Sequence, residues 1–361
     1  MRDRKVRMSY PPLMNFCSDN VSGAAPEILK ALESARHGSA MAYGDDNITR
    51  RVERRFAELF ERDVAVFFVA TGTAANALSL SVLVPPYGAV YVHPASHLTL
   101  DECGAPEFYT GGARLVEIAG RDGKLDPARL ARELARGAKG VVHHSQPAAI
   151  SLTQATECGT VYAPSEIAAL SELARAHGLA VQMDGARFAN AIVSLGCSPA
   201  DVTWKAGVDA LSFGATKNGA LAAEAVVLFS RAPAEAFGYR RKRAGHLFSK
   251  MRFLSAQLEA YLADGLWLRN ARHANEMAAR LADGLRGIPG LRILYPVQAN
   301  EVFLALPEQA IGALESQGFR FYRWETPEGE KGPVIRLVTA FDTQAGSVDA
   351  FITAARCTSS A

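Results

Sequence analysis

The sequence predicts an α/β fold, in which a large domain on a mostly parallel sheet precedes a smaller α+β domain. Three observations support this prediction: short apolar runs without polar alternation, helical patterns between these runs, and a change of pattern near Phe253. Strands of this kind are buried on both faces, and their alternation with helices favours a parallel sheet. We predict an N-terminal segment over residues 1–50 that joins the small domain, a large domain over 51–252 and a small domain over 253–361.

The expected strands of the large domain are rich in β-branched and aromatic residues, which favour extended structure. They cover residues 64–69, 89–93, 114–118, 140–143, 180–183, 210–213 and 225–229. One helix between them is marked at both ends, because Pro164 opens it and Gly178 provides a C-cap. Ligands on such sheets bind beyond the carboxyl ends of the strands, so polar residues there are the candidates for a site.

The small domain begins with a long helical pattern over residues 260–285, interrupted near Asp264 and Gly265. Shorter strands follow among further helices, and this mixture predicts an α+β domain. The expected strands cover residues 292–295, 301–306, 320–324 and 334–338.

The composition excludes several classes of protein. The 361 residues are 49% hydrophobic and 21% charged, with a net charge of +2, which is ordinary for a globular protein and gives no strong field for nucleic acid or anionic membranes. No apolar stretch is long enough to span a bilayer. The five cysteines are scattered without a CxxC pair, and no Cys/His spacing supports a metal site. We therefore expect a cytoplasmic protein without metal.

Lys217 and Asp184 each follow an apolar strand, and Arg187 comes three residues after Asp184. A lysine that forms a Schiff base, with a buried aspartate nearby, is the equipment of a pyridoxal 5′-phosphate (PLP) enzyme. The aspartate keeps the pyridine nitrogen protonated, so that the ring acts as an electron sink. The alternative is a surface turn with a helix-capping aspartate. The small residues after Asp184 favour a tight, buried position, where a carboxylate needs a partner.

Two further strand ends carry candidate residues. Gly72 and Thr73 lie between a strand and a helix, where free N–H groups and the helix dipole can bind a phosphate. No Walker lysine follows, and a plain N-capped turn is the alternative. His97 follows the strand at 89–93, where a histidine can stack on a flat cofactor or act as a base. Its alternative is a loop histidine that caps a helix.

Arginines mark two more candidate positions. Arg336 lies inside an apolar strand, where an arginine is costly unless it is paired, and holding a carboxylate is its natural use. The basic segment at residues 240–252 has a solvated helix as its default interpretation. It lacks the interleaved aromatic residues of a nucleic-acid surface, so an anion clamp for a phosphate fits it better.

Taken in order along the chain, these residues resemble the threonine aldolase family, which includes phenylserine aldolase-like members. The resemblance covers nearly the whole chain and rests on an ordered set of short motifs. The set comprises Phe16 to Asn20, Met41 to Asp46, Thr71 to Thr73, His97, Asp184 to Arg187, Lys217, Met251 with Arg252, and Arg336 to Thr339.

The resemblance implies the aspartate-aminotransferase fold (fold type I), PLP as cofactor, and a homodimer or homotetramer with shared active sites. It implies retro-aldol cleavage of L-threonine, L-allo-threonine and related amino acids to glycine and an aldehyde. Roles follow residue by residue. For the cofactor, Gly72 and Thr73 would hold the phosphate, His97 would stack on the ring, Asp184 would pair with the ring nitrogen and Lys217 would carry the Schiff base. For the substrate, Arg187 and Arg336 would hold the carboxylate beside Ser18. From a neighbouring subunit, Arg252, or alternatively Lys250 or Arg243, would reach the cofactor phosphate.

The sequence departs from the family pattern where many members have Thr-His-Asn-Gly, because Glu157 stands in place of the histidine. Cys17 stands where many members have arginine, and Asn218 replaces a glycine after the lysine. The catalytic base therefore stays open between His97, Glu157 and a water. Other PLP reactions, such as β-elimination, transamination or racemisation, are alternatives, because a fold does not fix its reaction.

Overall fold

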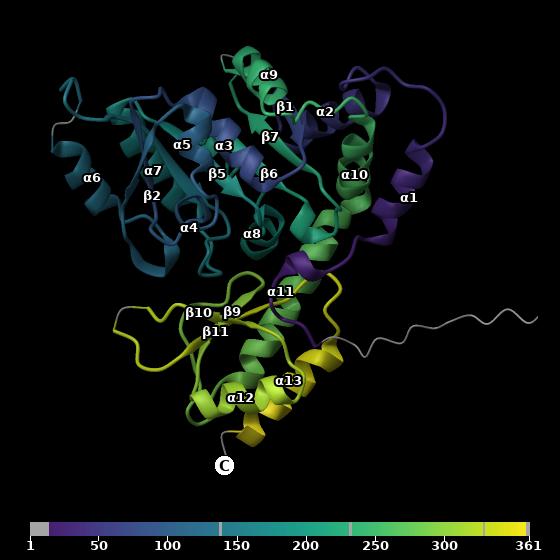
Figure 1. The fold of residues 1–361 in the computed structure, drawn as a ribbon, viewed down its shortest axis with the longest axis vertical. Helices are drawn as coiled ribbons and strands as arrows, with labels where there is room; N and C mark the ends of the chain where they lie inside the picture. Colours follow the sequence, from purple (N-terminus) through teal and green to yellow (C-terminus); the bar gives the residue numbers. More distant parts are fainter. Residues whose placement is uncertain (1–13, 137–138, 231–232, 328, 359–361) are drawn as a thin grey trace, which may run out of the picture.

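The structure is a computed structural model, which describes residues 14–136, 139–230, 233–327 and 329–358 (Figure 1). Its larger sheet has seven strands, β1 (Ala65–Val69), β2 (Gly88–Val92), β3 (Arg114–Glu117), β4 (Gln146–Thr153), β5 (Ala180–Gly185), β6 (Ala210–Gly214) and β7 (Glu224–Leu228). Their order is β1-β7-β6-β5-β4-β2-β3. The five strands from β6 to β3 are parallel to their neighbours, whereas β7 is antiparallel to both β6 and β1. The predicted mostly parallel sheet is confirmed.

The strand predicted at residues 140–143 is wrong. That segment is an exposed turn, in which the side chain of Gln146 accepts from the N–H of Gly140 and donates to the carbonyl of Val141. The real strand, β4, starts at Gln146 and Pro147. A polar residue and a proline at its start, and small residues in place of β-branched ones, hide this strand from a pattern search.

Helices cover the sheet. The described α-helices are α1 (Pro26–Ala35), α2 (Asn47–Leu59), α3 (Gly72–Leu83), α4 (His97–Leu100), α5 (Ala105–Thr110), α6 (Pro127–Ala135), α7 (Pro164–His177), α8 (Phe188–Leu195), α9 (Ala234–Arg243), α10 (Arg252–Leu262), α11 (Leu266–Leu285), α12 (Glu308–Ser316) and α13 (Ala345–Thr358). The helix predicted from Pro164 is α7, and Gly178 ends it with a φ of 73°. The break expected near residue 264 is also present, as a short 3-10 turn between α10 and α11.

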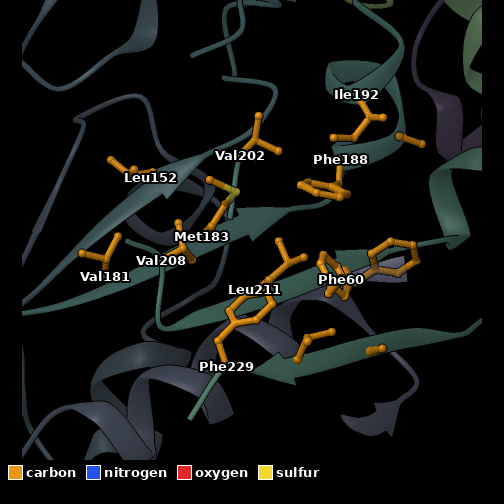
Figure 2. Packing of buried hydrophobic residues seen from close by; sticks show 14 of the residues in the cluster. Phe60, Leu152, Val181, Met183, Phe188, Ile192, Val202, Val208, Leu211 and Phe229 are labelled. Carbon is orange, nitrogen blue, oxygen red and sulfur yellow. The ribbon is translucent and has the colours of Figure 1, made fainter. Parts of the chain in front are cut away.

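The main core lies between the large sheet and its helices. Figure 2 shows Met183 of β5 and Leu211 of β6 near Phe188 of α8, with Phe60 beyond them. Apolar contact of this kind is the main source of the fold's stability. It also fixes the carboxyl ends of β5 and β6, from which the candidate site residues emerge.

A second sheet lies beside the C-terminal helices (Figure 1). It is antiparallel and consists of β8 (Arg292–Ile293), β9 (Glu301–Ala305), β10 (Tyr322–Trp324) and β11 (Val334–Val338) in the order β10-β11-β9-β8. A separate apolar core forms around it and includes Phe16. Core residues of α1, α2 and α10, such as Ile28, pack with the large sheet instead. The domain boundaries at residues 50 and 252 stay a prediction, and this packing places α1 and α10 with the large sheet, whereas the predicted boundaries place them in the small domain.

Two further observations concern membrane-spanning helices and cysteines. No helix among the described residues is long and apolar enough to cross a membrane. All five cysteines are free thiols. The cytoplasmic location expected from the scattered cysteines stays a prediction.

Candidate functional site

A cavity of about 370 Å³ opens at the carboxyl ends of the parallel strands. Its lining includes five of the residues predicted from the sequence, namely Gly72, Thr73, His97, Asp184 and Lys217. The remaining lining residues are Asn20, Ala70, Thr71, Asn76, Ala186, Thr216, Leu221, Ala222 and Glu224. Cavities of this size accommodate a small cofactor with its substrate.

Lys217 stands in the 3-10 turn η4 (Thr216–Asn218), just after β6. The last residue of the turn, Asn218, is buried and stabilises it. The Asn218 amide donates to the hydroxyl of Tyr261 at 2.7 Å and to the carbonyl of Trp267 at 2.8 Å. The asparagine that departs from the family pattern therefore anchors the lysine turn to α10 and α11.

The first turn of α3 faces the cavity. Thr71 caps the helix, because its hydroxyl accepts from the N–H of Ala74 at 3.2 Å. Gly72 and Thr73 form the first helical positions and line the cavity. Their N–H groups have no partner inside the helix, and the helix dipole adds positive potential, so this end suits an anion such as a phosphate.

A hydrogen-bonded network joins Asp184 to His97 across two side chains that the sequence analysis did not single out. Asp184 is buried and accepts from the N–H of Ala186 at 2.9 Å and from the Asn76 amide at 2.9 Å. The same Asn76 amide donates to Glu102 at 2.8 Å, and Glu102 pairs with Nδ1 of His97 at 2.9 Å. We call Asp184, Asn76, Glu102 and His97 the cavity wall.

The pKa values within the cavity wall follow from these contacts. The hydrogen bond with Glu102 raises the pKa of His97 above its usual value, and burial only partly opposes this effect. Burial raises the pKa of Glu102, while its bonds with His97 and Asn76 lower it. The ring of His97 is thus fixed by a carboxylate, which orients it and favours its protonated form.

Glu224 is a second carboxyl that the sequence analysis missed. It lies on β7, lines the cavity and accepts from the N–H of Ala215 at 2.8 Å. Burial raises its pKa to about 7, against the opposing effects of a hydrogen bond from Thr216 and the charge of Lys217. A neutral carboxyl beside the lysine turn is therefore available near neutral pH.

Next to the cavity lies a buried group of charged side chains built around Arg187. Arg187 donates to Asp19 from Nε at 2.7 Å and from Nη2 at 3.1 Å, a bidentate pair. Its Nη1 lies 4.0 Å from Glu157, and its Nη2 lies 3.5 Å from Glu301. Burial lowers the pKa of Arg187, but the three carboxylates raise it by more, so the guanidinium stays charged.

Arg336 of β11 joins this group from the second sheet. Its Nη1 lies 3.8 Å from Glu301, and its guanidinium stacks 4.2 Å over the ring of Trp324. Its Nη2 donates to the carbonyl of Cys17 at 3.4 Å. The structure therefore brings together the two arginines predicted to hold a carboxylate. We call Arg187, Arg336, Asp19, Glu157 and Glu301 the arginine cluster.

Other predicted residues lie outside the described lining of the cavity that contains Lys217. Ser18 caps a short turn by accepting from Asn20, and it lines an adjacent cavity of about 210 Å³. Arg252 donates to the carbonyl of Gly38 on an exposed surface. Lys250 and Arg243 are also absent from the lining described for the Lys217 cavity. The role of these three basic residues stays a prediction.

The residues missed at the sequence level left faint signals. Glu301 begins an apolar strand, and the cost argument applied to Arg336 applies equally to it. Asn76 lies in α3, three residues after Thr73, and Glu102 follows His97 by five positions. Their pairing depends on sheet register and helix direction, which short motifs do not encode.

Comparison with known proteins decides the family. The model of the beta-eliminating lyase family matches residues 15–309. The low specificity L-threonine aldolase of a Pseudomonas species is 47% identical over 333 residues, which cover 92% of this chain and 94% of that protein. The chain belongs to the threonine aldolase family. The predicted family, and with it the class of carbon-carbon lyase, is confirmed.

Solved structures agree with this family assignment. The threonine aldolase of Leishmania major superposes with a TM-score of 0.88 and 29% identity, covering 95% of this chain and 98% of that one. Rice TDC, solved with PLP, has a TM-score of 0.74 at 14% identity and covers 96% of this chain and 82% of that one, so it shows the fold alone. Fold type I is confirmed. Among the described residues, no group of three or more His, Cys, Asp or Glu side chains could hold a metal.

Proposed function

We propose that this chain is a PLP-dependent aldolase that cleaves L-threonine, L-allo-threonine and related L-β-hydroxy-α-amino acids reversibly to glycine and an aldehyde. The observation that supports this most directly is the placement of Lys217, Asp184 and the N-terminus of α3 around one cavity. The Pseudomonas relative is named a low specificity L-threonine aldolase, which supports L-threonine as one of these substrates. The arginine cluster beside the cavity adds the carboxylate-binding groups that an amino acid requires.

The residues present fit PLP. Asp184 is buried, its carboxylate is fixed by two donors, and it lines the cavity, as a partner for a protonated pyridine nitrogen should. Lys217 would form the Schiff base, Gly72 and Thr73 would hold the phosphate, and His97 would lie against the ring. When bound, PLP supplies an electron sink for the charge left on Cα as the Cα–Cβ bond breaks.

The base that accepts the β-hydroxyl proton is best assigned to His97. It lines the cavity and is oriented by Glu102, whereas Glu157 lies 4.0 Å from Arg187 and outside the described lining. A water held between the two is the remaining candidate. If Glu157→Gln keeps kcat within about twofold while His97→Phe lowers it at least about a hundredfold, the base is His97. The reverse pattern assigns it to Glu157.

The function also implies a partner subunit. Arg252, with Lys250 or Arg243 as alternatives, lies on an exposed surface away from the cavity of its own chain. We propose a homodimer or homotetramer in which one of these side chains reaches the phosphate of a neighbouring site. The substrate is a small amino acid, and neither nucleic acid nor membrane is a proposed partner.

The spectrum and the products test this function. The purified protein with PLP should be yellow, with an absorption band that Lys217→Ala removes, and it should release an aldehyde and glycine from L-threonine, L-allo-threonine and phenylserine. The family name keeps β-elimination as the second candidate. That reaction would give ammonia and a keto acid instead. A colourless protein that does not bind PLP would contradict both.

A further inference from the structure

Glu301 is the least satisfied charged side chain of the arginine cluster. It starts β9 and is 1% exposed, yet neither carboxyl oxygen accepts a hydrogen bond from the described residues. Oε1 lies 3.5 Å from Nη2 of Arg187 and 3.8 Å from Nη1 of Arg336. Glu301 therefore lies at the two guanidinium groups proposed to bind the substrate carboxylate.

The groups that face Glu301 come from every neighbouring segment. Arg187 follows β5, Arg336 lies on β11, and the carboxylates of Asp19 and Glu157 come from the N-terminal turn and the loop after β4. The thiol of Cys158, in the same loop, also faces it. If all five side chains of the arginine cluster carry their formal charges, the two arginines face three carboxylates, and the cluster has one negative charge in excess. A substrate carboxylate that entered such a buried cluster would raise the excess to two.

We propose that Glu301 is a positioning residue that must carry a proton before Arg187 and Arg336 can bind the α-carboxylate of the substrate. This inference rests on the proposed function, which supplies the amino-acid substrate. With Glu301 neutral, the two arginines balance Asp19 and Glu157, and one added carboxylate is tolerated. With Glu301 ionised, its carboxylate competes with the substrate for the same guanidinium groups.

The titration of Glu301 supports this role. Burial raises its pKa to about 7, while the charges of Arg187 and Arg336 partly oppose the shift. A bound carboxylate adds negative charge nearby and raises the pKa further. Binding and protonation then favour each other, so substrate affinity is highest at low pH and falls as the pH rises through the pKa of the free enzyme.

A purely structural Glu301 makes a different prediction. As a fixed ion-pair partner of the arginines it would keep its charge on substrate binding, and no proton would be taken up. The two roles therefore separate by a proton count, which does not depend on turnover.

The experiment is calorimetry of glycine binding to the PLP-loaded enzyme at pH 8, in buffers of different ionisation enthalpy. The comparison is between the wild type, Glu301→Gln, a neutral mimic of the protonated side chain, and Glu301→Asp. Proton changes of the glycine amine and of the cofactor are common to all three proteins and cancel in the differences. We expect the wild type to take up about one proton more than Glu301→Gln, because a group with a pKa near 7 is mostly ionised at pH 8.

The dissociation constant gives a second readout. The ratio of the wild-type constant to that of Glu301→Gln should rise about tenfold for each pH unit between the free and bound pKa values of Glu301, because the proton changes of the glycine amine cancel in the ratio. The ratio of the Glu301→Asp constant to that of Glu301→Gln should show the same rise with a shifted midpoint. The KM for threonine should follow the same pattern, with kcat changing less.

Equal proton uptake and equal pH dependence in the wild type and Glu301→Gln would overturn the proposal. If Glu301→Gln does not fold, the wild type is compared with Glu301→Asp, and an identical pH dependence of the dissociation constant for glycine in these two proteins from pH 6 to pH 9 overturns it as well. A failed proposed function gives a distinct result: no aldehyde from any β-hydroxy amino acid, with the proton uptake on glycine binding intact.

Discussion

The cavity wall and the arginine cluster are both buried and charged, but they differ in how their carboxylates are satisfied. Both oxygens of Asp184 accept hydrogen bonds, and Oε1 of Glu102 accepts two, although Oε2 of Glu102 accepts none. Neither oxygen of Glu301 accepts one. Unsatisfied buried acceptors are costly, so they are retained where a ligand or a proton completes the site.

The difference teaches that the two halves of the site are prepared in different ways. The cavity wall is held by a neutral amide, that of Asn76, which donates to two carboxylates and fixes both before a ligand arrives. Such preorganisation lowers the cost of stabilising charge in a reaction. The arginine cluster instead holds more negative than positive groups, and its charge can change. It is the half that responds to substrate and to pH.

The substitution expected to have the largest effect on the arginine cluster is Arg187→Met. The side chain keeps an unbranched apolar stem but loses the guanidinium charge that three carboxylates share. Removing one partner of a buried pair costs about 3–5 kcal/mol. We expect the free energy of unfolding in urea to fall by this amount, and aldehyde release to fall at least about a hundredfold as carboxylate binding is lost.

A matched control is Arg280→Met, which breaks the exposed pair with Asp349 on the surface. It should leave both unfolding and activity nearly unchanged, because exposed pairs contribute little. Equal effects of the two substitutions would contradict the central place given to Arg187.

The same comparison shows what the sequence can predict. Lys217 and His97 follow apolar strands and Asp184 lies at the end of one, and the rule that ligands bind at parallel strand ends predicts that the three residues meet. Asn76 and Glu102 escape this rule, because their role depends on the direction in which α3 and the short helix after β2 leave the sheet. The prediction misplaces β4, yet the site is not affected, because the predicted ends of β5 and β6 lie within two residues of the observed ends.

The sequence predicts the two arginines of the arginine cluster but not Glu301, because the contacts of Glu301 depend on the pairing of strands. Arg336 was found because an arginine is costly in an apolar strand, and Glu301 meets the same criterion at the start of another. Its partner depends on the antiparallel register, in which Arg336 is paired with Phe303 and Glu301 with Val338. No local pattern of residues states that register.

The cavity wall can be probed with a milder substitution, Glu102→Gln. The amide keeps the shape of the side chain but removes the charge that raises the pKa of His97. That pKa should fall toward its ordinary value, so a base at His97 is deprotonated at lower pH and the acid limb of kcat/KM moves to lower pH. The maximum should fall about tenfold, the rate equivalent of one charge-assisted hydrogen bond.

His97→Phe is the control for this profile, because it should lack the acid limb that Glu102→Gln moves. The measurement is kcat/KM for threonine across pH in the three proteins. An acid limb that stays in place in Glu102→Gln would assign the titration to another group and would detach Glu102 from the base.

The last expected effect is on the free energy of unfolding, and it tests whether ion pairing stabilises Glu301 in its buried position. Because burial raises its pKa from 4.5 to about 7, the folded state binds more protons than the unfolded state between these values. Stability therefore falls as the pH rises from 4.5 through 7. Glu301→Gln lacks this loss, so it should match the wild type at pH 4.5 and exceed it at pH 8 by at most about 3 kcal/mol, since one pKa unit is worth about 1.4 kcal/mol. Urea unfolding at the two pH values measures the difference.

A variant that is instead less stable than the wild type at pH 8 would mean that attraction to Arg187 and Arg336 outweighs the cost of burying the charge. Glu301 would then be an ordinary ion-pair partner, and the contrast between the two halves of the site would disappear.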